Sequence, residues 1–151
     1  MEYDGLVELL PWGRNVYTIL RVDHALGEAA RSAGTRRVEG SIEDLSVNLG
    51  VNRADVLPDA FMYVGSGLRR RLGAGPGDVV RCRLRPADPD DVPLADDVRA
   101  ALVAARRLTS FKQRTAPERR RLLQPIEDAV KDGTRRSRID ALIRTQDRDA
   151  D

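Results

Sequence analysis

The stretch Pro86-Ala-Asp-Pro-Asp-Asp-Val-Pro-Leu94 divides the chain into two parts of different character. It contains three prolines and three aspartates, which the interior of a strand or of a helix does not tolerate. Before it, apolar residues partly alternate along short segments, and after it they recur at helical spacing. We therefore interpret residues 87–94 as a linker between a β-domain, residues 1–86, and a helical appendage, residues 95–151.

The part before the linker has the composition of short strands joined by turns. Residues 11–15, Pro-Trp-Gly-Arg-Asn, form a turn cluster that predicts a hairpin. Two short helices are expected at residues 23–33 and 66–72, with Asp23 and Ser66 as their N-caps. The expected strands are residues 2–10, 16–22, 37–42, 45–51, 60–64 and 79–84. About six short strands without a βαβ rhythm predict an α+β protein built on a small β-barrel or sandwich.

The part after the linker predicts a helical hairpin or three short helices. The first helix is expected from Leu94, with its apolar face at Val98, Ala101, Leu102, Ala105 and Leu108. Thr115 and Glu118 have the spacing of a capping box, so a second helix should begin there and be kinked or ended by Pro125. A third helix is expected from about Gly133, with a buried face formed by Ile139, Leu142 and Ile143.

Length and composition exclude several classes of protein. The chain has 151 residues, close to the size of a single domain, and no apolar run approaches the roughly 20 residues that span a bilayer. We therefore expect no membrane insertion. The opening Met1-Glu-Tyr-Asp-Gly5 has acidic residues where a secretory signal has a basic start, which predicts a cytoplasmic protein. One cysteine and one histidine exclude an internal disulfide and a multi-histidine metal site, so no metal and no cofactor are expected.

The net charge of +2 hides an uneven distribution. Residues 99–144 carry 13 basic and five acidic side chains, and 24 of the 26 basic residues of the whole chain are arginines. We expect a basic surface on the appended helices that could meet a macromolecular partner. Its members would be Arg119, Arg120, Arg121, Arg135 and Arg136.

A search for catalytic motifs gives no nucleophile elbow, phosphate loop or dinucleotide fingerprint. The remaining candidate catalytic residues are His24, Asp55 and Tyr63, which are titratable but form no recognised constellation. Cys82 alternates with Val80 and Leu84 along a strand, so we expect a buried, unreactive thiol. A polar and aromatic pocket wall, suited to a ligand, is expected from Trp12, Arg14, Asn15, Tyr17, Asn48 and Tyr63.

Two segments resemble known families. Residues 66–84, Ser-Gly-Leu-Arg-Arg-Arg-Leu-Gly-Ala-Gly-Pro-Gly-Asp-Val-Val-Arg-Cys-Arg-Leu, followed by the Val-Pro-initiated helix of residues 92–102, resemble the domain of unknown function 1905 family. Residues 111–143, with Ala-Pro-Glu-Arg-Arg-Arg-Leu-Leu at 116–123, resemble the helical tail of the YdeI or OmpD-associated (bacteriocin-protection) family. The resemblance implies a closed, double-split-type barrel with a helical tail and a link to antimicrobial or stress resistance. It implies no established catalytic residues, and the polar segment 45–59 departs from the expected pattern.

The turn Leu72-Gly-Ala-Gly-Pro-Gly-Asp78 also resembles that of swapped-hairpin transcription factors of the AbrB type. This resemblance implies DNA binding, but those proteins are much shorter, and the positive charge here lies on the appended helices. DNA binding is therefore the less favoured alternative.

Three hypotheses follow for the function. The first, which we favour, is a non-catalytic barrel that binds a small molecule or a partner peptide. The second is a small-molecule enzyme of the isomerase or cyclase type, with candidate groups at Tyr17, His24, Asn48, Asp55 and Tyr63. It requires at least two of these side chains to converge on a cavity, and a barrel filled with aliphatic groups would contradict it. The third is the AbrB-like DNA-binding protein. The ligand, the reaction and the oligomeric state stay open at this point.

Overall fold

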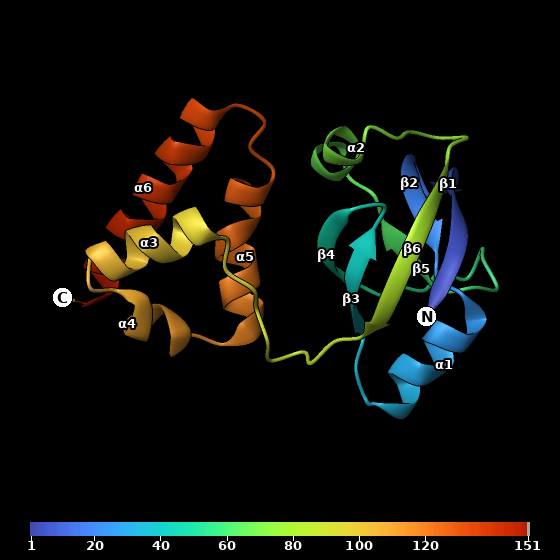
Figure 1. Cartoon of the computed structure of the whole chain (residues 1–151), viewed down its shortest axis with the longest axis horizontal. Helices are drawn as coiled ribbons and strands as arrows, with labels where there is room; N and C mark the ends of the chain where they lie inside the picture. Colours follow the sequence, from blue (N-terminus) through green and yellow to red (C-terminus); the bar gives the residue numbers. More distant parts are fainter. Residues whose placement is uncertain (151) are drawn as a thin grey trace. The chain divides into compact units, whose positions relative to one another are not determined.

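The structure of the protein, a computed structural model, describes residues 1–150, so residue 151 of the expected appendage lies outside the described part. The chain separates into two compact units, Met1–Pro89 and Asp90–Asp151. We call them the sheet unit and the helical unit. The boundary falls inside the proline- and aspartate-rich segment that follows the last strand (Figure 1).

The sheet unit is an α+β fold around one six-stranded antiparallel sheet with the strand order β4-β3-β6-β1-β2-β5. The predicted hairpin across residues 11–15 is confirmed, since β1 and β2 pair directly with Trp12 opposite Asn15. The strands are β1 (Glu2–Trp12), β2 (Asn15–Arg21), β3 (Arg37–Ile42), β4 (Leu45–Gly50), β5 (Phe61–Tyr63) and β6 (Val79–Pro86).

The sheet is not closed into the barrel that we expected. Its edge strands β4 and β5 do not form a ladder. The segment after β4 is linked to β5 by an isolated bridge between Asn52 and Phe61. In that bridge the Asn52 N–H donates to the Phe61 carbonyl at 2.8 Å, and the Phe61 N–H donates to the Asn52 carbonyl at 2.9 Å. The physical reason is the shortness of the two edges: β4 ends at Gly50, and β5 has three residues.

Two helices complete the sheet unit and lie at opposite ends of it (Figure 1). Helix α1 (His24–Ser32) is capped as predicted, because the Asp23 carboxylate accepts a hydrogen bond from the Ala25 N–H at 3.2 Å. The predicted cap of α2 (Ser66–Leu72) is wrong, since Ser66 is the first helical residue and the extended Gly65 occupies the N-cap without a side-chain bond. Helix α2 ends as predicted at Gly73, which has a φ of +64°.

The main core of the sheet unit is apolar throughout. Strands β1, β2, β3, β5 and β6 contribute aliphatic side chains and Cys82, and the two helices add Leu26 and Leu68. Its buried residues are Val7, Leu20, Val22, Leu26, Val38, Ile42, Ala60, Met62, Val64, Leu68, Val80, Cys82 and Leu84, and Tyr3 is among the partly buried side chains packed against them. A smaller second cluster, formed by Leu10, Ile19, Ala54 and Phe61, involves the opposite faces of β1, β2 and β5.

The helical unit has four helices: α3 (Asp96–Ala104), α4 (Leu108–Lys112), α5 (Ala116–Glu127) and α6 (Asp132–Ala150). Leu108, expected at the end of the first helix, instead opens α4. The cause is a turn in which the Arg106 φ is +58°, a conformation that ends an α-helix. Helix α6 contacts the other three helices, and the unit has its own core: Val98, Leu102, Phe111, Leu123, Ile126, Ile139 and Leu142.

The predicted start of α5 is confirmed, because the Glu118 N–H donates to the Thr115 hydroxyl oxygen at 3.3 Å. Pro125 does not end this helix, which continues to Glu127. The missing Pro125 N–H removes one intrahelical hydrogen bond, and the two residues that follow it stay helical. Among the described residues, no helix combines the length and the apolar character needed to cross a membrane.

Candidate functional site

Four of the six aromatic residues of the chain meet on one face of the sheet unit. The ring of Tyr17 lies between Trp12, at a centroid distance of 6.2 Å, and Tyr63, at 5.5 Å. Phe61 meets Tyr63 edge to face at 5.3 Å. These distances and tilted orientations are those of favourable aromatic pairs. We call the three outer members, Trp12, Tyr17 and Tyr63, the aromatic surface.

Strand register explains why these residues meet. In the β1–β2 hairpin Leu10 faces Tyr17, and in the β2–β5 pair Ile19 faces Tyr63, so alternate residues of three strands share one face. Leu10, Ile19 and Phe61 are buried below and carry the outer rings, while Tyr63 is 40% exposed and Trp12 and Tyr17 are half-buried. The rings therefore form a supported apolar surface rather than a closed pocket.

The polar residues that we expected in the pocket wall, Arg14, Asn15 and Asn48, do not all lie beside the aromatic surface. Asn15 lies beside it, because its side-chain nitrogen contacts the Tyr17 hydroxyl at 3.4 Å, and Arg14 is exposed at the hairpin turn. Asn48 is directed elsewhere: its oxygen accepts a hydrogen bond from the Arg37 Nε at 2.8 Å across the β3–β4 pair. Its Nδ2 is buried without a hydrogen-bond partner.

The three candidate catalytic residues come from separate elements. His24 is exposed at the first position of α1, Asp55 is exposed in the segment between β4 and β5, and Tyr63 ends β5. Within residues 1–150 no hydrogen bond or ion pair joins any two of them. Proton transfer needs groups within hydrogen-bond reach of the reacting atoms, and this arrangement does not supply a pair.

Cys82 is buried, as its alternation along the strand predicted. Burial raises the pKa of its thiol to about 11, and the neighbouring Tyr3 has its phenol pKa raised for the same reason. The thiol therefore stays protonated at neutral pH and cannot act as a nucleophile. The flanking Arg81 and Arg83 point outward and pair with Glu2 at 2.8 and 3.0 Å.

The predicted basic surface divides into engaged and exposed arginines. Arg119 donates to the Arg114 carbonyl at 3.2 Å and to the Asp90 carbonyl at 3.1 Å. Arg135 donates to both carboxylate oxygens of Asp97 at 2.6 and 2.8 Å and to the Ile126 carbonyl at 3.2 Å. These two residues therefore hold the helical unit together. Arg121 and Arg136 are exposed, and Arg120 is half-buried.

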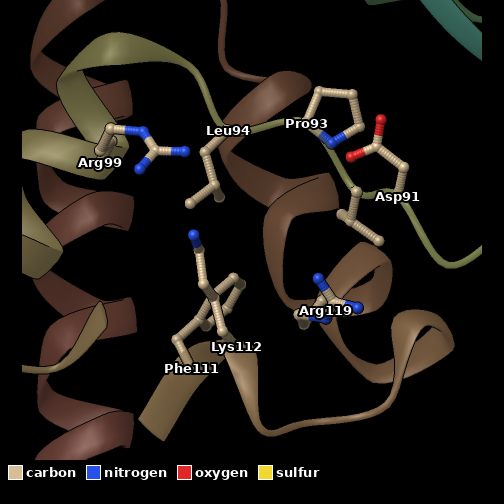
Figure 2. Close-up of a pocket in the computed structure, with 8 residues that line it drawn as sticks. Asp91, Pro93, Leu94, Arg99, Phe111, Lys112 and Arg119 are labelled. Atoms are coloured by element: carbon tan, nitrogen blue, oxygen red, sulfur yellow. The ribbon is translucent and has the colours of Figure 1, made fainter. Parts of the chain in front are cut away.

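The helical unit contains a pocket of about 320 Å³ that the sequence did not predict. Figure 2 shows the Arg99 guanidinium and the Lys112 ammonium on one side of the space and the Arg119 guanidinium on the other, with Leu94 and Pro93 bordering it. We call it the cationic pocket. It is lined by Asp91, Val92, Pro93, Leu94, Arg99, Phe111, Lys112 and Arg119.

The residues of the cationic pocket come from four places in the unit. The segment before α3 supplies Asp91 to Leu94, α3 supplies Arg99, α4 supplies Phe111 and Lys112, and α5 supplies Arg119. Only the tertiary packing of these helices brings them together. The one feature of the sequence that could have drawn attention to this site is Lys112, which is one of only two lysines among 26 basic residues.

No group of three or more His, Cys, Asp or Glu side chains in the described part of the chain is arranged to hold a metal ion. Comparison of the chain with protein-family models, with curated proteins and with solved structures finds no match. The functional argument therefore depends on the aromatic surface and the cationic pocket themselves.

Proposed function

We propose that the protein is a non-catalytic binding protein whose sheet unit binds an extended, proline-containing segment of a partner. The observation that carries the proposal is the aromatic surface, where three of the six aromatic side chains of the chain reach the outside together. Tyrosine and tryptophan are enriched at binding surfaces because they combine large apolar area with a polar tip.

Two features favour a proline-containing peptide as the occupant. Proline-rich segments adopt an extended helix without internal hydrogen bonds, so their rings pack on aromatic faces and their carbonyls accept hydrogen bonds. The Trp12 indole N–H and the Tyr63 hydroxyl make no hydrogen bond with any described residue, so both are available as donors to such carbonyls.

The alternatives are less well supported. The interior between the sheet and its two helices is filled with apolar side chains, which favours a binding role over catalysis in a barrel cavity. DNA binding would draw on the basic surface, of which Arg119 and Arg135 are engaged in bonds within the helical unit.

We also propose that the sheet unit is related to the closed, double-split-type barrel of the domain of unknown function 1905 family. The Asn52–Phe61 bridge joins the two ends of the sheet at one point, as a barrel with one weak seam would. The link to antimicrobial or stress resistance rests on the family resemblance alone.

Trp12 is the only tryptophan, so its emission reports directly on the aromatic surface. The experiment selects from two displayed peptide libraries against the full chain, one with a fixed Pro-x-x-Pro core and one with alanines in place of those prolines. We expect enrichment from the proline library, and the synthetic forms of the selected peptides should shift the Trp12 emission in a saturable titration.

Single substitutions then locate the binding. Tyr63→Ala should weaken the selected peptides by about tenfold or more, the effect of removing a central aromatic contact. Val79→Ala is the matched control, because Val79 is 63% exposed on β6 and outside the aromatic surface. Equal enrichment from both libraries, or unchanged affinity in Tyr63→Ala, would refute the proposal.

A further inference from the structure

The cationic pocket of the helical unit carries an excess of positive charge. Arg99, Lys112 and Arg119 line it, and Asp91 is its one carboxylate. Arg99 and Lys112 are exposed, and neither side chain forms an ion pair or hydrogen bond within the described part of the chain. Some other arginines of the unit form ion pairs, as Arg107 does with Asp147 at 2.7 Å. The charges of Arg99 and Lys112 are therefore available to an anion.

Arg119 differs from those two because its position is fixed. Its guanidinium donates to the carbonyls of Arg114 and Asp90, which hold it at one side of the pocket. A cation that is already ordered loses little conformational freedom when it binds a ligand. The pocket thus combines one oriented cation with two exposed ones, unpaired among the described residues, on the facing side (Figure 2).

The remaining wall contains apolar side chains beside the Asp91 carboxylate. Val92 and Leu94 are half-buried against the core of the helical unit, and Phe111 is 1% exposed. Val92 and Leu94 offer an organic anion an apolar contact that an inorganic ion would not make. The volume of about 320 Å³ is near the lower limit for small-molecule sites, which restricts the ligand to a few heavy atoms beyond a single ring.

We propose that the cationic pocket binds a small organic carboxylate with an aromatic or branched aliphatic body. The carboxylate lies between the cations, and the body packs on the side chains of Leu94 and Val92. This site is separate in residues and in unit from the aromatic surface, so either proposal can fail without the other.

The two lysines permit a direct experiment on the full chain. Reductive methylation with ¹³C-formaldehyde keeps the positive charge and labels Lys112, Lys131 and the amino terminus. Lys112→Gln assigns the Lys112 methyl signal by its loss. Benzoate is then titrated at constant ionic strength, with benzamide as the neutral probe of the same shape and inorganic phosphate as the anion without an apolar body.

We expect benzoate to move the Lys112 signal along a saturable curve while the Lys131 signal stays in place. Lys131 is the internal control, because it is exposed in the same unit and outside the pocket. Parallel shifts of both lysines would show general ion binding and overturn the proposal. A response to benzamide equal to that of benzoate would also overturn it, and so would phosphate that binds as tightly as benzoate.

Variants complete the test without disturbing the fold. Arg99→Gln removes an exposed side chain that has no ion pair among the described residues, and it should weaken benzoate by about fivefold, the effect of one solvent-exposed charge pair. Arg136→Gln is the matched control, since it removes an exposed arginine of α6 outside the pocket. Equal benzoate affinity in both variants would contradict the proposal.

Discussion

Replacing Gly40, even by the small residue alanine, should strongly destabilise the sheet unit. Gly40 lies in β3 between β4 and β6 with a φ of +141°, and a Cβ atom there would overlap the carbonyl oxygen of Arg83. Gly40→Ala should therefore lower the free energy of unfolding of the sheet unit by roughly 2–4 kcal/mol. Urea unfolding followed by Trp12 emission measures it.

The control for this prediction is Gly75→Ala. Gly75 has no heavy atom within 4 Å of the position that a Cβ would take, and its φ is not positive. The change should stay within about 0.5 kcal/mol. Equal unfolding midpoints for the two variants would contradict the role assigned to Gly40.

At the scale of residues, local chemistry was predictable and register-dependent chemistry was not. The caps Asp23 and Thr115 were predicted because a side-chain oxygen and an amide two or three residues later form a local bond. Ser66 offered the same signal, but the extended Gly65 took the cap position. Gly40 gave no signal, since its conformation depends on the neighbouring strand β6.

At the scale of elements, Arg135 joins three helices of the helical unit. From α6 it donates to both carboxylate oxygens of Asp97 in α3 and to the carbonyl of Ile126 in α5. Arg135→Gln should lower the free energy of unfolding of this unit by about 1 kcal/mol at pH 7, a value limited by the partial exposure of the pair. Urea unfolding followed by circular dichroism of the helices measures it.

The effect of Arg135→Gln should depend on pH in a definite direction. The Arg135 guanidinium lowers the pKa of Asp97 in the folded state, so the pair stabilises the fold above the ordinary aspartate pKa of about 4. This stabilisation is lost as the pH falls through the lowered pKa. The difference in the free energy of unfolding between wild type and Arg135→Gln should therefore shrink in that pH range. Arg136→Gln, at the neighbouring exposed position, should have the same free energy of unfolding as the wild type both at pH 7 and at acidic pH. A difference that stays constant from pH 7 to acid would contradict the assignment.

The strands and helices themselves were largely predictable from the sequence. Whether the sheet closes, and which side chains from different helices meet, were not. All six strands and both helices of the sheet unit follow from alternation, turn residues and caps. The open seam between β4 and β5 does not, because it depends on how few backbone groups the two edges offer each other. The rings of Trp12, Tyr17 and Tyr63 meet, but Asn48, which was expected in the same wall, lies elsewhere. The cationic pocket was missed because it combines three helices.

At the scale of the whole molecule, the two units have separate cores. The buried residues of the sheet unit and those of the helical unit form distinct clusters, and the segment between them is rich in proline and aspartate. The helical unit has a complete core centred on Phe111, Leu102 and Ile126, which is the property of a unit that can fold by itself.

We therefore expect residues 90–151, expressed alone, to fold into helices that unfold cooperatively. At roughly 60 residues the fragment should be stable by only a few kcal/mol, because a core of this size buries little surface. Phe111→Ala removes its largest buried side chain and should abolish the cooperative transition, whereas Lys131→Ala, at an exposed position, should preserve it. Circular dichroism during thermal unfolding distinguishes these outcomes. A fragment without helical signal would mean that the helical unit draws its stability from the sheet unit after all, since its own seven-residue core would then be insufficient.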